Sequence, residues 1–184
     1  MALISQTELE TKLGRSLTTD ETNAFTSTNE SLQYLIEEMI GSYLESNGLE
    51  YRYYDGGVQH LSIDPCSSIQ SIDLVDDDQT STYTYDTTDY TKEPINKELK
   101  RYIRHRSGPF TTGINNIRVY ADFSIECDDR ILSIVKEAML EALVSEISNT
   151  DNIKRESIEG YSIEYATTEV KDAISKIMYL FPQV

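Results

Sequence analysis

The run from Ile131 to Ser148, ILSIVKEAMLEALVSEIS, is the most apolar stretch of the chain and constrains its fold most strongly. Its apolar residues recur at steps of three and four, which predicts a helix. One broad face holds Ile131, Val135, Ala138, Met139, Ala142 and Leu143. Leu140 and Val144 lie on the other side and leave only a narrow polar stripe. Two interpretations remain open: an ordinary core helix, or a helix whose second face contacts a neighbouring subunit through Leu140 and Val144.

Two further helices are expected near the N-terminus. Ser5-Gln6-Thr7-Glu8 fits a capping box, and Leu13-Gly14 is a typical helix end. A second capping box runs from Thr18 to Glu21 and opens a long helix over about 20–46, which Asn47-Gly48 should end. We expect the second half of this helix to pack against the 131–148 helix.

The middle of the chain changes to the alternating pattern of strands. Residues 51–54 and 58–63 flank Asp55-Gly56-Gly57 and read as a hairpin, and Pro65 should break the chain after it. Further strands are expected over 69–75, 80–90 and 116–125. The segment 96–106 is irregular and is expected to form a helical turn or a mobile loop. The predicted fold class is α+β, mainly a helical bundle with a small antiparallel β-sheet or hairpins.

The last predicted element is a strongly amphipathic helix over 168–181, and Pro182 should end it. Its apolar stripe comprises Val170, Ala173, Ile174, Ile177, Met178 and Phe181. This stripe could pack on its own domain or contact a partner. No internal repeat or linker is visible, so residues 1–184 are expected to form one domain ending in this helix.

The charge is strongly acidic and unevenly distributed. The chain carries 32 acidic and 16 basic residues, a net charge of −16. Residues 1–92 hold 17 acids and 4 bases (net −13), and residues 93–184 hold 15 and 12 (net −3). A chain of this charge should not bind DNA non-specifically, because such binding needs basic groups that displace counterions. No apolar run is long enough to span a bilayer, so no membrane partner is expected.

We find no constellation that would support catalysis, and expect no enzyme activity, cofactor or metal. His60 and His105 are the only imidazoles, and neither has a partner that the sequence identifies. Cys66 and Cys127 form no metal-binding pair and are expected to be reduced thiols. The Asp76-Asp77-Asp78 cluster lacks the later glycine and glutamate of a calcium loop and reads as a solvated turn.

One segment runs against the overall charge. Lys97, Lys100, Arg101, Arg104 and Arg106 lie within ten residues and, with Glu98, sum to +4. The segment could be a solvated loop. It could also dock on an acidic surface of a partner or of the next copy of this chain. Contact with DNA phosphate is a third, weaker interpretation.

Four stretches together resemble the head–tail connector (adaptor) proteins of long-tailed phages. They are LISQTELETKLGRSLTTDE, YYDGGVQHLSIDPCSSIQSIDL, GPFTTGINNIRVYADF and ESIEGYSIEYA, in that order along most of the chain. The SIECDDR segment departs from the pattern because it lacks the family's proline before the main helix.

The resemblance implies a virion protein, present in the host cytoplasm during assembly. It implies a homo-oligomeric ring, commonly of twelve copies, between the portal protein and a head-completion (stopper) or tail protein. DNA would pass through the ring without specific binding. The resemblance also implies that the C-terminal helix extends toward the portal protein and contacts it. The expected interface residues are Ile174, Ile177, Tyr179 and Phe181.

Three rival functions stay open. A tail-completion or other neck or tail protein would assemble on the tail tube. An enzyme or small-molecule binder would need a pocket with perturbed titratable groups. An acidic DNA mimic would bind a DNA-binding enzyme and form no ring.

Overall fold

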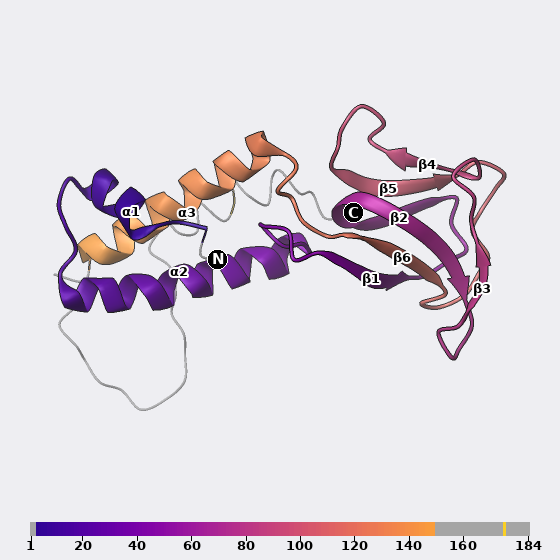
Figure 1. Ribbon diagram of the computed structural model, residues 1–184, viewed down its shortest axis with the longest axis horizontal. Helices are drawn as coiled ribbons and strands as arrows, with labels where there is room; N and C mark the ends of the chain where they lie inside the picture. The colour runs from indigo at the N-terminus through magenta and orange to yellow at the C-terminus, as the bar shows by residue number, and fades with distance from the viewer. Residues whose placement is uncertain (1–2, 150–174, 176–184) are drawn as a thin grey trace. The chain divides into compact units, whose positions relative to one another are not determined.

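The computed structural model describes residues 3–149 and residue 175, and these fall into two units (Figure 1). The helical unit takes in the described residues of 3–39 and 130–149. It contains α1 (Gln6–Leu13), nearly all of α2 (Thr19–Ile40) and α3 (Asp129–Asn149). The sheet unit comprises residues 40–129. The prediction of a single domain over residues 1–184 stays a prediction.

Both predicted capping boxes are confirmed. The Ser5 hydroxyl accepts the Glu8 N–H at 3.3 Å, and the Glu8 carboxylate accepts the Ser5 N–H at 2.7 Å. Thr18 and Glu21 exchange the same two bonds at 3.3 and 2.7 Å. These bonds satisfy backbone donors that have no partner inside the helix, which fixes where each helix begins.

Helix α2 ends earlier than predicted. It stops at Ile40 because Gly41 adopts φ +67°, a left-handed conformation that glycine takes at little cost. The expected helix end at residue 46 is therefore wrong. Tyr43 instead forms a parallel bridge with Ser124, beside the sheet.

The predicted apolar face of α3 is buried, apart from its first residue. Val135, Ala138, Met139, Ala142 and Leu143 are buried, and Ile147 extends the stripe. Ile131, Leu140 and Val144 are half-buried. The helical unit is tied together by polar contacts as well. Asn29 donates to the Ile4 carbonyl at 2.8 Å, and Lys12 of α1 pairs with Glu137 of α3 at 2.7 Å.

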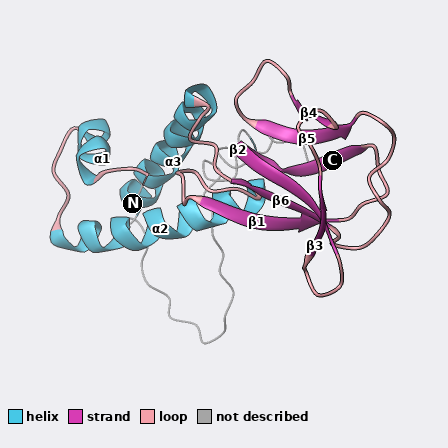
Figure 2. Cartoon of the chain, turned by 45° about the vertical axis from the view of Figure 1, so that its right-hand side comes forward, coloured by secondary structure: helices cyan, strands magenta, loops and turns pink. Residues whose placement is uncertain are grey.

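The sheet unit is built from six antiparallel strands (Figure 2). They are β1 (Leu49–Tyr54), β2 (His60–Val75), β3 (Ser81–Thr84), β4 (Tyr90–Glu93), β5 (Lys100–His105) and β6 (Ile117–Asp122). The order is β1-β6-β2-β5-β4, and β3 pairs with β2 beside this path. The strands enclose a buried hydrophobic cluster that includes Ile72, Ile103, Phe110, Val119 and Phe123.

The long strand β2 changes partner halfway along its length. Its first part pairs with β5 from His60 to Cys66, and its second part pairs with β6 from Ser67 onward. The ladder with β5 shifts register between Ser62 and Cys66, where Pro65 lies. Proline has no N–H for a ladder, so an irregularity of this kind is where a strand tolerates it. Pro65 therefore lies at the point where one continuous strand changes partner, and the predicted break there is wrong.

The predicted fold class is wrong in its balance. The described residues form a six-stranded antiparallel sheet with three helices, and not mainly a helical bundle with a small sheet. The segment 96–106, which was expected to be a loop or helical turn, contains β5. Ile103 is the one buried apolar side chain of β5, so the alternating pattern was too weak to predict a strand. The expected strand 80–90 is divided between β3 and β4.

The predicted hairpin is also wrong. Strand β1 pairs with β6 and not with the strand that follows it. The Gly56-Gly57 pair packs closely against the segment before β6, and a Cβ on Gly56 would lie 1.9 Å from the Thr111 carbonyl oxygen. Gly56 is thus required by the close approach of two backbones, whereas Gly57 is favoured by its left-handed φ of +91°.

We predict that Glu21 titrates far below an ordinary glutamate. Hydrogen bonds from Arg15 and then from the Thr18 N–H lower the pKa of Glu21 to about 2. Because this pKa is depressed, the contribution to helix stability is present above about pH 4.5 and is lost as the pH falls toward 2. Carboxyl-detected NMR titration of the native chain measures this directly. Arg15→Gln should raise the pKa of Glu21 part of the way back to 4.5, because the bonds from Thr18 remain, and an ordinary pKa in the unsubstituted chain would contradict the geometry.

Candidate interaction surfaces

The two histidines have structural partners. His60 lies 2.7 Å from the Glu93 carboxylate and stacks on Tyr102, with ring centroids 4.9 Å apart. The Nδ1 atom of His105 lies 2.9 Å from the Gly108 carbonyl, so it is the protonated nitrogen that donates there. The described residues place no serine, threonine or cysteine nucleophile in hydrogen-bond contact with either imidazole.

The two thiols are poor nucleophiles. Cys66 is fully buried, and burial raises its pKa to about 12. Burial also raises the pKa of Cys127, to about 11. A thiol reacts as its thiolate, so both side chains are inert near neutral pH. Across residues 3–149 and residue 175, no group of three histidine, cysteine or acidic side chains is placed to hold a metal ion.

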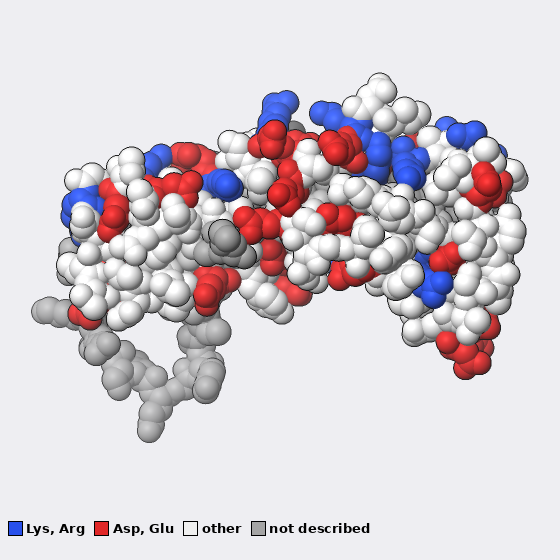
Figure 3. Space-filling view, in the orientation of Figure 1, with Lys and Arg blue, Asp and Glu red and all other residues white. Residues whose placement is uncertain are grey.

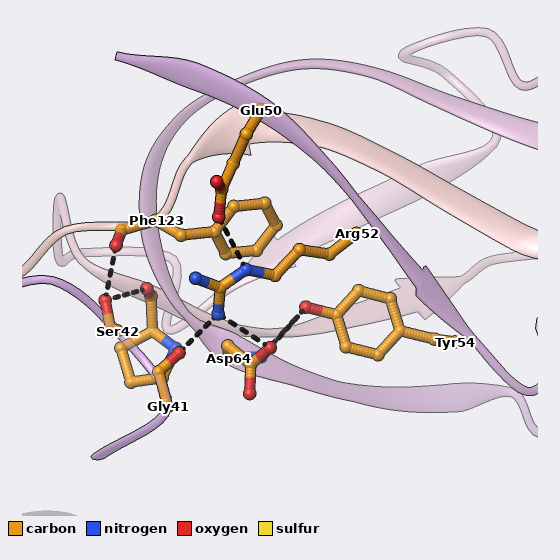
Figure 4. A network of polar contacts seen from close by, with 8 residues as sticks. Gly41, Ser42, Glu50, Arg52, Tyr54, Asp64 and Phe123 are labelled. Atoms are coloured by element: carbon orange, nitrogen blue, oxygen red, sulfur yellow. Dashed lines mark hydrogen bonds and ion pairs between the residues drawn. The ribbon is translucent and has the colours of Figure 1, made fainter. Parts of the chain in front are cut away.

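A polar network around Arg52 organises one end of the sheet unit (Figure 4). The Arg52 guanidinium donates to the Gly41 carbonyl, to Asp64 at 3.0 Å and to Glu50 at 2.8 Å. The Cζ atom of this guanidinium lies 4.3 Å from the centroid of the Phe123 ring, within range of a cation–π contact. Burial alone would lower the pKa of Arg52, but the hydrogen bonds to Asp64 and Glu50 outweigh it and raise the pKa.

The residues after Gly41 complete this network. The Ser42 hydroxyl lies 2.8 Å from both the Pro65 and the Phe123 carbonyl oxygens and is a donor to both. It therefore links β2 to the residue that follows β6. Tyr43 then donates its N–H to the Phe123 carbonyl at 2.9 Å and accepts the Ile125 N–H at 2.9 Å. The chain leaving α2 is thus fixed to strands that lie far from it in sequence.

Sequence reasoning did not find this network, although a signal was present. Arg52 is the only basic residue between Arg15 and Lys92. A single cation in so long an acidic stretch is expected to attract several carboxylates. The importance of Gly41 could be seen only in the structure, where a Cβ at this position would lie 2.7 Å from an Asp64 carboxylate oxygen.

The five basic residues of segment 97–106 do not act as one patch. Lys97 lies in the loop before β5, and Lys100, Arg101 and Arg104 lie on the strand itself. Arg101 shares the face of the buried Ile103, and the cost of burial lowers its pKa. Arg101 is therefore a poor docking residue.

Lys100 is committed to its own loop. Its ammonium donates to the carbonyls of Pro94 at 2.9 Å, of Ile95 at 3.5 Å and of Lys97. An ammonium has three N–H donors, and these three carbonyls occupy them. Lys100 thus holds the 94–97 loop beside β5.

The exposed cations of this segment are Lys97, Arg104 and Arg106. Arg104 pairs with Glu93 at 3.2 Å while its side chain stays 53% exposed, and Arg106 contacts the Thr91 hydroxyl at 3.2 Å. Figure 3 shows basic side chains gathered over β5 and the loop that leads into it, while both acidic and basic groups are spread over the rest of this view. These three residues form the part of the predicted docking surface that is accessible.

A hollow of about 570 Å³ opens near the turn after β2. Its lining includes Arg52, Asp64, Asp76, Asp77 and Asn115. Small-molecule sites are mostly apolar with a few placed polar groups, and this lining is mostly charged and amide side chains. The hollow therefore fits a solvated surface feature better than a ligand site.

The other predicted interface residues are placed only in part. Leu140 and Val144 are half-buried on α3, and nothing shows what covers them. Ile174, Ile177, Tyr179 and Phe181 lie outside the described residues, as does most of the predicted 168–181 helix. In the described part of the chain, no helix has both the length and the hydropathy needed to cross a bilayer.

The fold is shared with chains from two solved particle necks. One comes from the neck of an empty gene transfer agent (GTA) particle computed with C6 symmetry. It is 13% identical, with a TM-score of 0.57, over 95% of this chain and 88% of that one. The other comes from the neck of a native GTA particle computed with C12 symmetry, with 11% identity, a TM-score of 0.52 and coverage of 84% and 81%. No family model and no curated protein matches the sequence.

We predict that Arg52→Met destabilises the sheet unit by about 2 kcal/mol. Breaking a fully buried ion pair costs roughly 3–5 kcal/mol, and we expect a smaller loss because the Arg52 side chain is still 22% exposed. The substitution leaves the Gly41 carbonyl and the Asp64 carboxylate without their cation. Chemical denaturation followed by circular dichroism measures the loss. Arg104→Met is the matched control, since its pair is exposed and should cost below about 1 kcal/mol. Equal losses for the two variants would contradict the role given to Arg52.

We also predict slow thiol chemistry in the native chain. With pKa values of about 12 and about 11, at pH 8 each thiol should be ionised in about one molecule per thousand or fewer. An aromatic disulfide reagent should therefore react with Cys127 slowly and with the buried Cys66 only after urea is added. Rapid release of two equivalents from folded protein would disprove this assignment.

Proposed function

We propose that this chain is a structural protein of the neck of a phage-like particle. The observation that carries the proposal is the shared fold, which extends over 95% of this chain and 88% of a chain from a particle neck. Likeness along nearly the whole length of both chains leaves little room for a separate functional module. The motifs of connector proteins found in the sequence point the same way.

More specifically, we propose a head–tail connector (adaptor) that forms a ring between the portal protein and a stopper or tail protein. The ring would contain twelve copies and surround the passage for DNA. The net charge of −16 supports this role, since a passage lined by acidic protein repels phosphate and does not retain DNA. The chain would act in the virion and be made in the host cytoplasm.

We further propose that the chain is not an enzyme. Both thiols have raised pKa values, and both imidazoles are engaged by a carboxylate or a carbonyl. These groups are buried, half-buried or engaged in hydrogen bonds, which suits a protein whose role is to bind its neighbours. A tail-completion protein would share these properties, and binding to portal separates it from a connector.

The test is to mix the purified chain with the portal protein and image the complex by electron microscopy. We expect a ring of the chain on the portal, with twelve-fold symmetry. Assembly on tail tubes with no affinity for portal would favour the tail-completion alternative. Absence of the chain from both would refute a role in the neck.

A truncated chain tests the predicted reach toward the portal. Ending the chain before residue 168 removes the predicted helix with Ile174, Ile177, Tyr179 and Phe181. We expect portal binding to fall by at least about tenfold, which is about 1.4 kcal/mol, while the circular dichroism of the sheet unit is kept. Replacing Ile174 and Ile177 with serine should also weaken portal binding. Unchanged portal binding of both the truncated chain and this variant would contradict a contact between the C-terminal helix and the portal.

A further inference from the structure

An exposed row of α2 combines acidic and apolar side chains. Glu30, Tyr34 and Glu38 follow at steps of four and so share one face of the helix. All three are exposed, Tyr34 to 65%, and the neighbouring Leu35 is 42% exposed. Two such apolar side chains between carboxylates are typical of a contact surface.

The exposed face around β5 has the opposite charge and its own apolar residue. Lys97 and Arg104 are exposed, and Ile95 in the loop held by Lys100 is 66% exposed. The Lys100 ammonium contacts the Lys97 carbonyl, so Lys97 lies at the Lys100 end of the strand. This face therefore combines an exposed apolar side chain with exposed cations, whereas the α2 row combines exposed apolar side chains with carboxylates.

We propose that the α2 row of one copy of this chain docks on the β5 face of the next copy. Glu30 and Glu38 would face Lys97 and Arg104, in either order, with Tyr34 and Leu35 against Ile95. The contact joins different surfaces of two copies, and a head-to-tail contact of this kind closes into a ring when its rotation permits. The inference rests on the proposed function for the meaning of that ring, although the contact itself is testable without it.

A second copy is the occupant that the charges favour. Two copies of a protein with net charge −16 repel each other over most of their surfaces. The exposed cations of segment 97–106 are Lys97, Arg104 and Arg106, and they outnumber its one exposed acid, Glu98. Arg104 also pairs with Glu93 but stays 53% exposed, so an acidic surface of another copy can approach these cations favourably. The row on α2 offers such a surface, since no basic residue occurs between Arg15 and Arg52.

The test uses two complementary charge reversals in the full chain. One variant carries Glu30→Lys and Glu38→Lys, and the other carries Lys97→Glu and Arg104→Glu. Sedimentation velocity at low salt should show self-association of the unsubstituted chain that weakens as salt rises. Each variant alone should associate at least about tenfold more weakly, because every contact then joins like charges. A mixture of the two should recover association, because both kinds of contact between them are complementary.

A matched control separates this pairing from a change in overall charge. Asp77→Lys with Asp78→Lys alters the net charge by the same amount as the α2 variant but lies in the turn after β2. We expect this control to associate at least as well as the unsubstituted chain. Circular dichroism of all variants reports whether they fold, and Glu30→Gln with Glu38→Gln gives a milder loss if lysine is not tolerated.

The outcomes distinguish this inference from the proposed function. A chain that stays monomeric at low salt, or a mixture that does not recover association, overturns the pairing. Rings on portal that form equally well with either variant also overturn it and leave the neck role intact. Association that follows the charges, in a protein absent from particle necks, would support the pairing and refute the neck role.

Discussion

A single guanidinium links four separate segments of the sheet unit. Arg52 of β1 contacts the Gly41 carbonyl, two carboxylates and the Phe123 ring, and so joins the end of α2 to β1, β2 and β6. Gly41 adopts a left-handed backbone conformation that favours glycine, and any larger residue there would also have to displace the Asp64 carboxylate. Removing the cation would leave the Gly41 carbonyl without this donor and the Asp64 carboxylate with only the Tyr54 hydroxyl, so the local chain path and the ion cluster stabilise each other.

Local signals in the sequence predicted what depends on local interactions. The capping boxes at Ser5 and Thr18 and the buried face of α3 involve residues at most a few turns apart, and they are confirmed. Strand pairing is not local. Nothing in the residues before Gly56 indicated that β1 would pair with β6, about sixty residues further on, in place of the adjacent strand. The balance between helix and sheet was misjudged for a different reason, because β5 has only one buried apolar side chain and so gave too weak a local pattern.

The candidate surfaces show the same division. The basic segment was visible as a charge anomaly, but its use depends on side-chain direction. Lys100 caps the carbonyls of its own loop and Arg101 shares the face of Ile103, which leaves Lys97, Arg104 and Arg106 accessible. The Arg52 network required the long-range fold to be known, although a lone cation in an acidic stretch was a usable signal.

A density map of the neck in intact particles tests the account most directly. We expect a ring of copies around the DNA passage, next to the portal, in which the six strands of the sheet unit and the partner change at Pro65 can be recognised. Particles whose neck contains no copy of this fold built from this chain, and whose tails attach normally, would contradict it.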